Sequence, residues 1–130
     1  MDRISLKTIL YLSLALAFFH GLATYYNLYF FIWWFDIPMH LLGGVLVGTV
    51  ALFFYRFFCL KGMIKEDEHT AWTLLIASIL FVGGAWELFE YAKGITFNTI
   101  GSYRLDVLKD LAVDILGVVF SGVYYLSNKK

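Results

Sequence analysis

Long stretches of this chain carry no formal charge, and their spacing predicts its architecture. The uncharged stretches are residues 8–35, 37–55, 69–86 and 115–128. The last is short, but its helical pattern extends backwards through Asp114 and Asp110. About 20 apolar residues in a helix cross the hydrocarbon core of a bilayer. The pattern therefore predicts an all-α membrane bundle of four transmembrane helices, at about 8–26, 36–58, 70–92 and 106–126.

Three segments connect these predicted helices. Residues 27–35 are rich in aromatic side chains, whose amphipathic rings favour the headgroup level of a membrane. Residues 59–69 form a polar loop. Residues 94–104 contain turn residues such as Asn98.

Lys and Arg are distributed unevenly between the two ends of the predicted helices. The end that holds both termini and the 59–69 loop carries seven: Arg3, Lys7, Arg56, Lys61, Lys65, Lys129 and Lys130. The opposite end carries three: Lys93, Arg104 and Lys109. Cytoplasmic loops are enriched in Lys and Arg. Both termini are therefore predicted to be cytoplasmic, with the 27–35 and 94–104 loops outside.

Composition supports a multi-pass protein of a cell (cytoplasmic) membrane and narrows its function. The 130 residues give room for one domain, 1–130, and 61% of them are hydrophobic. Zero net charge argues against nucleic acid as a partner. Cys59 is the only cysteine, so no internal disulfide forms. The sequence lacks the G-x-S-x-G, H-E-x-x-H and P-loop motifs of serine hydrolases, zincins and nucleotide-binding proteins.

Acidic residues gather at the predicted outer ends of the helices. Six of the ten lie there: Asp36, Glu87, Glu90, Asp106, Asp110 and Asp114. Their spacings of three and four residues place them on shared helix faces. His40 follows Asp36 by four residues, and His20 reaches a similar depth from the first helix. Charged groups in a bilayer cost a few kcal/mol or more, so these side chains should turn inward and find partners.

The charge balance at this end favours a bound cation. Six acids face three bases, which leaves three negative charges in excess if the histidines are neutral. Mixed Asp, Glu and His ligands suit a divalent Zn, Mn or Fe ion better than Ca, and helical bundles build metal sites from such pairs. The predicted metal ligands are His40, Glu87, Asp110, Asp36 and His20. The predicted catalytic groups are Asp114 and Glu87.

Structural roles are open for several of these residues. Asp36 could cap its helix or orient the His40 ring from outside the ligand sphere, and Asp106 could also be a cap. Glu90 pairs by spacing with Lys93. A packed histidine bonded to a backbone carbonyl is an alternative for His20. The deeper polar groups are His40, Glu87 and Asp110. Their carboxyl or imidazole atoms should converge within about 5–6 Å, as a ligand sphere requires.

Three short motifs resemble the VanZ-like membrane proteins. They are D-x-x-x-H from Asp36, the glutamate of WELFE (86–90), and D-x-x-x-D-x-x-G from Asp110. The segment 106–117 is also similar to the final motif of the YjdF-like inner-membrane proteins. The resemblance implies a prokaryotic cytoplasmic membrane and an outward-facing site. VanZ-like proteins are associated with teicoplanin-type glycopeptide resistance.

The leading hypothesis is a membrane protein whose metal site acts on a lipid or lipid-linked headgroup of the cell envelope. The metal would polarise a phosphate or ester, and a carboxylate would serve as general base. The alternatives are an oligomeric ion or proton transporter, since intramembrane acids and histidines mark such pathways, and a non-catalytic accessory protein. Membrane lipids are the expected partners. Gly44 and Gly48 form a G-x-x-x-G pair that favours close helix packing and leaves a homo-oligomer open.

Overall fold

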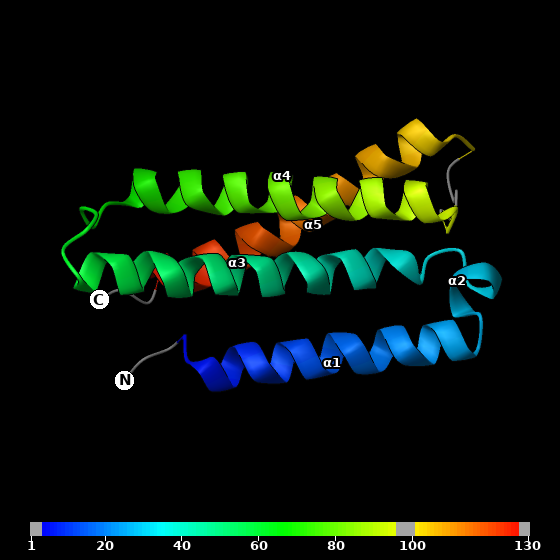
Figure 1. Cartoon of the computed structure of the whole chain (residues 1–130), viewed down its shortest axis with the longest axis horizontal. Coiled ribbons are helices and arrows are strands. Elements are labelled where there is room, and N and C mark those ends of the chain that lie inside the picture. Colours follow the sequence, from blue (N-terminus) through cyan, green and yellow to red (C-terminus); the bar gives the residue numbers. More distant parts are fainter. Residues whose placement is uncertain (1–3, 96–100, 128–130) are drawn as a thin grey trace.

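Five helices form an antiparallel bundle in the computed structural model, which describes residues 4–95 and 101–127. They are α1 (Leu6–Tyr25), α2 (Leu28–Phe31), α3 (Asp36–Leu60), α4 (Glu68–Lys93) and α5 (Tyr103–Ser127). Each long helix reverses the direction of the one before, so α1 begins and α5 ends at the same end of the bundle (Figure 1). The all-α class is confirmed. The four long helices agree with the predicted ranges to within three residues at each end.

Three helices in the described part of the chain are long and apolar enough to cross a membrane: α1, α3 and α4. The sequence predicted a fourth span, and α5 is not among the three. It carries the most charged side chains of the long helices. The short helix α2 was not predicted. Asn98 and the terminal bases Arg3, Lys129 and Lys130 lie outside the described residues.

Helices α3 and α5 approach each other most closely. A methyl group on Gly44 would collide with the backbone carbonyl oxygen of Asp114, and one on Gly117 would collide with the carbonyl of Leu41. A Cβ on Gly48 would lie 2.9 Å from the Cβ of Ser121. Small residues let membrane helices bring their backbones together in this way. The contact turns the polar side chains near the starts of α3 and α5 toward each other.

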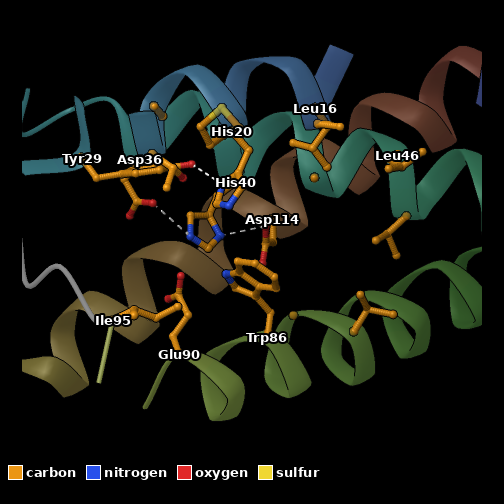
Figure 2. Close-up of a pocket in the computed structure, with 18 of the residues that line it drawn as sticks. Leu16, His20, Tyr29, Asp36, His40, Leu46, Trp86, Glu90, Ile95 and Asp114 are labelled. Atoms are coloured by element: carbon orange, nitrogen blue, oxygen red, sulfur yellow. Dashed lines mark hydrogen bonds and ion pairs between the residues drawn. The ribbon is translucent and has the colours of Figure 1, made fainter. Parts of the chain in front are cut away.

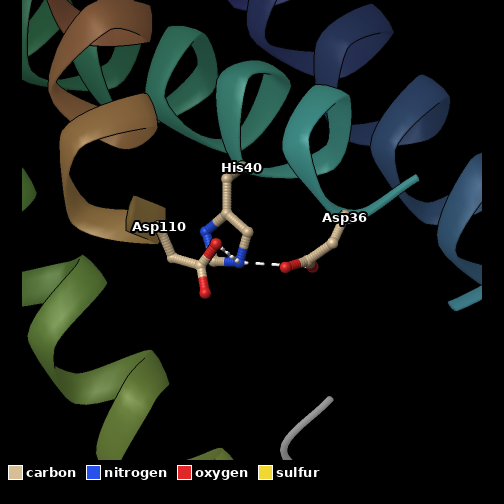
Figure 3. Close-up of side chains that lie close together, drawn as sticks. All are labelled: Asp36, His40 and Asp110. Carbon is tan, nitrogen blue, oxygen red and sulfur yellow. Dashed lines mark ion pairs between the residues drawn. The ribbon is translucent and has the colours of Figure 1, made fainter. Parts of the chain in front are cut away.

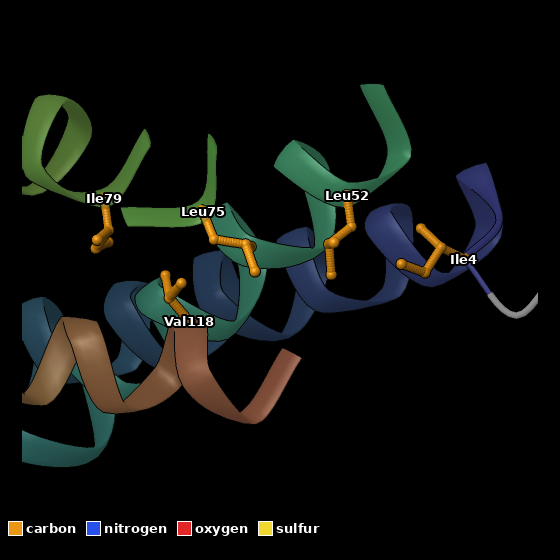
Figure 4. Close-up of a cluster of buried hydrophobic side chains, with 5 residues drawn as sticks. All are labelled: Ile4, Leu52, Leu75, Ile79 and Val118. Atoms are coloured by element: carbon orange, nitrogen blue, oxygen red, sulfur yellow. The ribbon is translucent and has the colours of Figure 1, made fainter. Parts of the chain in front are cut away.

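The apolar core lies in the half of the bundle away from Asp36 and the three aspartates of α5. Its fully enclosed side chains include Leu52 of α3, Leu75 and Ile79 of α4, and Val118 of α5 (Figure 4). Many large apolar side chains instead cover the outside of the bundle, for example Phe81 at 79% exposure. Such a surface is typical of a protein surrounded by lipid rather than water.

The loop between α3 and α4 is held by two sets of hydrogen bonds. The Asp67 carboxylate accepts from the Thr70 backbone N–H at 2.8 Å and from the Thr70 hydroxyl at 2.6 Å, which caps α4. These bonds hold the pKa of Asp67 below its usual value. The Tyr55 hydroxyl donates to the Asp67 carbonyl at 2.8 Å and accepts from its N–H at 2.9 Å. At its other end α4 stops at Gly94, in the left-handed conformation that glycine adopts without strain.

Candidate metal centre

Two helices supply the polar cluster at the end of the bundle where α3 and α5 begin. Helix α3 begins at Asp36 and presents His40 one turn later, while α5 presents Asp106, Asp110 and Asp114 at successive spacings of four residues. The close contact of α3 with α5 brings these two faces together. His40 and the three α5 carboxylates are all buried.

His40 lies at the centre of this cluster and uses both ring nitrogens. Its Nε2 is 3.4 Å from Asp36 Oδ1 and 3.7 Å from Asp110 Oδ1 (Figure 3). Its Nδ1 is 3.2 Å from Asp114 Oδ1. An ionised carboxylate only accepts hydrogen bonds, so Nδ1 carries the hydrogen that Asp114 accepts. Nε2 then faces two carboxylates and can hold a proton or a cation between them.

The geometry of Asp36, His40 and Asp110 suits a metal ion. Each offers one ligand atom, and the three atoms lie within 4.8 Å of one another. Zinc bonds of about 2.0–2.2 Å place two ligands of a tetrahedral site about 3.3–3.5 Å apart, close to the two distances at Nε2. A cation bound here would meet Nε2 while Asp114 holds Nδ1–H. Such a carboxylate partner commonly fixes the orientation of a ligating histidine.

Lys109 adds one positive charge to the cluster. Its Nζ lies 3.2 Å from Asp36 Oδ2, 3.0 Å from Asp106 Oδ1 and 2.9 Å from Asp110 Oδ1. Asp36 therefore turns one oxygen to Lys109 and the other to His40. Four carboxylates with one lysine and a neutral imidazole leave three negative charges in excess. A divalent cation would offset most of that excess.

Glu87 and His20, also predicted as ligands, lie outside this group. Glu87 is 5% exposed, and its Oε1 has no hydrogen-bond partner among the described residues. A buried carboxylate oxygen without a partner is costly, which indicates a proton or cation nearby. His20 is exposed on α1, and its Nδ1 lies 2.8 Å from the Tyr29 hydroxyl. Burial, and then the charges of Asp36 and Glu90, raise the pKa of Tyr29, so this hydroxyl stays neutral.

The predicted convergence thus holds for part of the set. His40, Asp110 and Asp36, three of the five predicted ligands, form the group of ligand atoms. Asp114 contacts Nδ1 of the His40 ring, and its predicted catalytic role stays a prediction. The spacing of Asp106 and Lys109, three residues apart, was the available signal for the lysine's role, since such pairs share a helix face.

A cavity of about 620 Å³ adjoins this cluster (Figure 2). Helices α1, α3 and α4 supply most of its lining. Asp36, His40 and Asp114 open onto it, whereas Asp110 is not part of the lining. A molecule in the cavity would therefore meet His40 from one side while α5 closes the other.

Comparison with known proteins assigns the chain to a family. No curated protein matches the chain, and no solved structure does. A family model described as a predicted membrane protein (DUF2238) matches residues 2–130.

This match corrects the expected VanZ-like identity, because the family that matches is DUF2238 and not VanZ. The expected link to glycopeptide resistance falls with it. Acids and histidines spaced by four residues will serve any buried polar cluster between helices, so the short motifs do not separate one family from another. Over nearly its whole length, the chain belongs to the DUF2238 family of predicted membrane proteins.

Proposed function

We propose that this protein holds a divalent cation between Asp36, His40 and Asp110 and acts on the polar headgroup of a membrane lipid or lipid-linked molecule. The observation that carries the proposal is the convergence of the three ligand atoms within 4.8 Å. They lie in a buried cluster with surplus negative charge, beside a cavity lined by three helices. Zn, Mn and Fe fit this mixed donor set.

The chemistry follows from the surrounding side chains. A bound divalent cation would polarise a phosphate or ester oxygen. Asp114 holds the His40 ring through Nδ1, and Lys109 limits the repulsion between the carboxylates. Glu87, predicted as a catalytic group, is the proposed general base, and its buried Oε1, which has no hydrogen-bond partner among the described residues, supports this role.

The proposed topology has four spans with both termini cytoplasmic. Helix α5 buries Asp106, Asp110 and Asp114 against the bundle and exposes Leu116 and Phe120. The surface that α5 presents to lipid is therefore more apolar than the amino-acid composition of the whole helix. The excess of Lys and Arg at the end where α1 begins supports a cytoplasmic location for that end. The metal cluster then lies near the outer membrane face.

Metal analysis of the purified full chain tests the proposal, with two matched variants. Asp110 and Asp106 lie one turn apart, are both buried and both pair with Lys109, but only Asp110 belongs to the ligand group. We expect about one equivalent of metal in the natural protein, a large loss in Asp110→Asn and a much smaller loss in Asp106→Asn. No metal above the detergent background, or equal loss in both variants, would contradict the proposal.

A further inference from the structure

The cavity beside the metal cluster has a polar end and an apolar end. Asp36 and Glu90 line it at the level of the cluster, and Val47 and Ile79 line it further down α3 and α4. Eleven residues separate the two levels on each helix, so the cavity extends about 16 Å along the bundle. Its volume lies within the range of small-molecule sites.

The charged side chains that line the cavity are all acidic. They are Asp36, Glu90 and Asp114; the histidines His20 and His40 also line it, and neither Lys nor Arg occurs among its lining residues. The rings of Trp86 and Tyr29 also border the polar end. Carboxylates beside aromatic rings complement an ammonium group, through charge and through cation–π attraction.

One side of the cavity faces the surrounding lipid. Helices α1 and α4 flank it without an extended contact in the described part of the chain, and they meet where the His20 and Trp86 rings lie 6.2 Å apart. Of the described side chains of α1, only Ala23 is buried. In a bilayer, a hydrocarbon chain would reach the cavity sideways between these two helices.

We infer that the cavity binds a membrane amphiphile with an ammonium-bearing headgroup and a hydrocarbon tail. The ammonium group would lie beside Glu90 and Trp86, and one tail would follow Leu46 and Val47. The inference rests on the proposed function, because it names the substrate class of the same site. Charge complementarity at the polar end distinguishes this occupant from a purely anionic lipid.

The test compares two lipids with the same acyl chains, one with a charged amine and one in which an acetyl group removes that charge. The full chain, in detergent, is offered equal amounts of an ethanolamine phospholipid and its N-acetylated form with the same acyl chains. Retained lipids are counted by native mass spectrometry. We expect about a tenfold preference for the amine, the size of one desolvated cation contact, and a reduced preference in Glu90→Gln. Equal retention of the two lipids by the natural protein would overturn the inference.

Tail binding is tested with bulky side chains placed inside and outside the cavity. Leu46→Trp on α3 and Val82→Trp on α4 should each block retention of both lipids, because both positions line the cavity. Leu116→Trp and Phe81→Trp are the controls, since both positions are exposed and neither lines it. Full retention in both cavity variants would overturn the inference.

Metal content measured in the same samples separates the two proposals. Leu46→Trp should keep its metal while losing lipid. Metal present without an amine preference overturns this inference alone. An amine preference without metal overturns the metal proposal and leaves the lipid site standing.

Discussion

At the scale of single residues, His40 joins three carboxylates from two helices. Asp36 and Asp110 face Nε2, and Asp114 takes Nδ1. The spacing of residues predicted that these groups share helix faces. It could not predict which oxygen meets which nitrogen, because that depends on the approach of α3 to α5. Asp36 thus joins the ligand group as predicted, and Asp114 contacts the His40 ring from the other side.

The Asp114→Asn variant tests the orienting role of this carboxylate. The amide keeps the size of the side chain but can present N–H to the ring, so it no longer fixes the Nδ1–H tautomer. We expect metal affinity to fall by about 10- to 100-fold, the usual cost of removing such a partner. Competition with a chelator measures the affinity. An affinity equal to that of the natural protein would show that Asp114 does not position His40.

Lys109→Met tests whether a metal ion can replace this lysine as the positive charge beside the buried carboxylates. Lys109 pairs with Asp36, Asp106 and Asp110, and its loss leaves buried carboxylates without that partner. We expect the free energy of unfolding to fall by about 3–5 kcal/mol in chelator. Added divalent metal should restore more stability to this variant than to the natural protein. Thermal unfolding with and without metal checks both points, and equal metal effects would contradict them.

At the scale of elements, the contact between α3 and α5 brings the site together. The sequence predicted closely packed helices from their glycines, and the helix limits from uncharged runs. It did not indicate α2, a single turn within an aromatic segment. It also could not indicate which pair of helices packs most closely, since glycines occur on α3, α4 and α5 alike.

Gly44→Ala and Gly43→Ala form a matched pair for this contact. A methyl group at Gly44 would strike the Asp114 backbone, whereas at Gly43 its nearest neighbour is Asp114 Oδ1 at 4.0 Å. We expect Gly44→Ala to lose about 1–3 kcal/mol through overpacking. Gly43→Ala should be neutral or gain up to about 1 kcal/mol of helix propensity. Unfolding midpoints in detergent compare them, and equal midpoints would refute a close contact at Gly44.

The Asp67 cap of α4, at the end of the bundle away from the metal cluster, predicts that the stability of the fold depends on pH. Its hydrogen bonds to Thr70 lower the folded pKa of Asp67 below the ordinary value of 3.8. The stabilisation is therefore complete well above pH 3.8 and is lost as the pH falls through the lowered value. The difference in unfolding midpoint between the natural protein and Asp67→Ala should shrink toward acid. A difference that stays constant with pH would contradict the role of this carboxylate.

At the scale of the whole molecule, the bundle separates the end that holds the metal cluster from an apolar half. The buried polar side chains described in the apolar half include Thr49 and Ser121, and both donate to the Val45 carbonyl. These bonds stay within the protein and supply no ionisable relay. This supports a site at one membrane face over an ion path through one protomer.

Thiol labelling tests the proposed orientation. In a Cys59→Ser background, Arg104→Cys lies at the end with the metal cluster and Lys65→Cys lies in the loop between α3 and α4; both positions are exposed. An impermeant reagent added to intact cells should label position 104 and not position 65. The reverse pattern would place the cluster at the cytoplasmic face.

The acidic face of α5 also has a consequence for biogenesis. Asp106 and Asp110 pair with Lys109 of the same helix, but Asp110 and Asp114 find His40 only on α3. In the proposed topology, α5 would present these carboxylates to lipid if it left the translocon alone. Its release into the bilayer is therefore coupled to docking on α3. A nascent chain that stops before α5 leaves His40 without two of its three carboxylate neighbours. Quality-control proteases would then find an incomplete bundle with this polar side chain exposed.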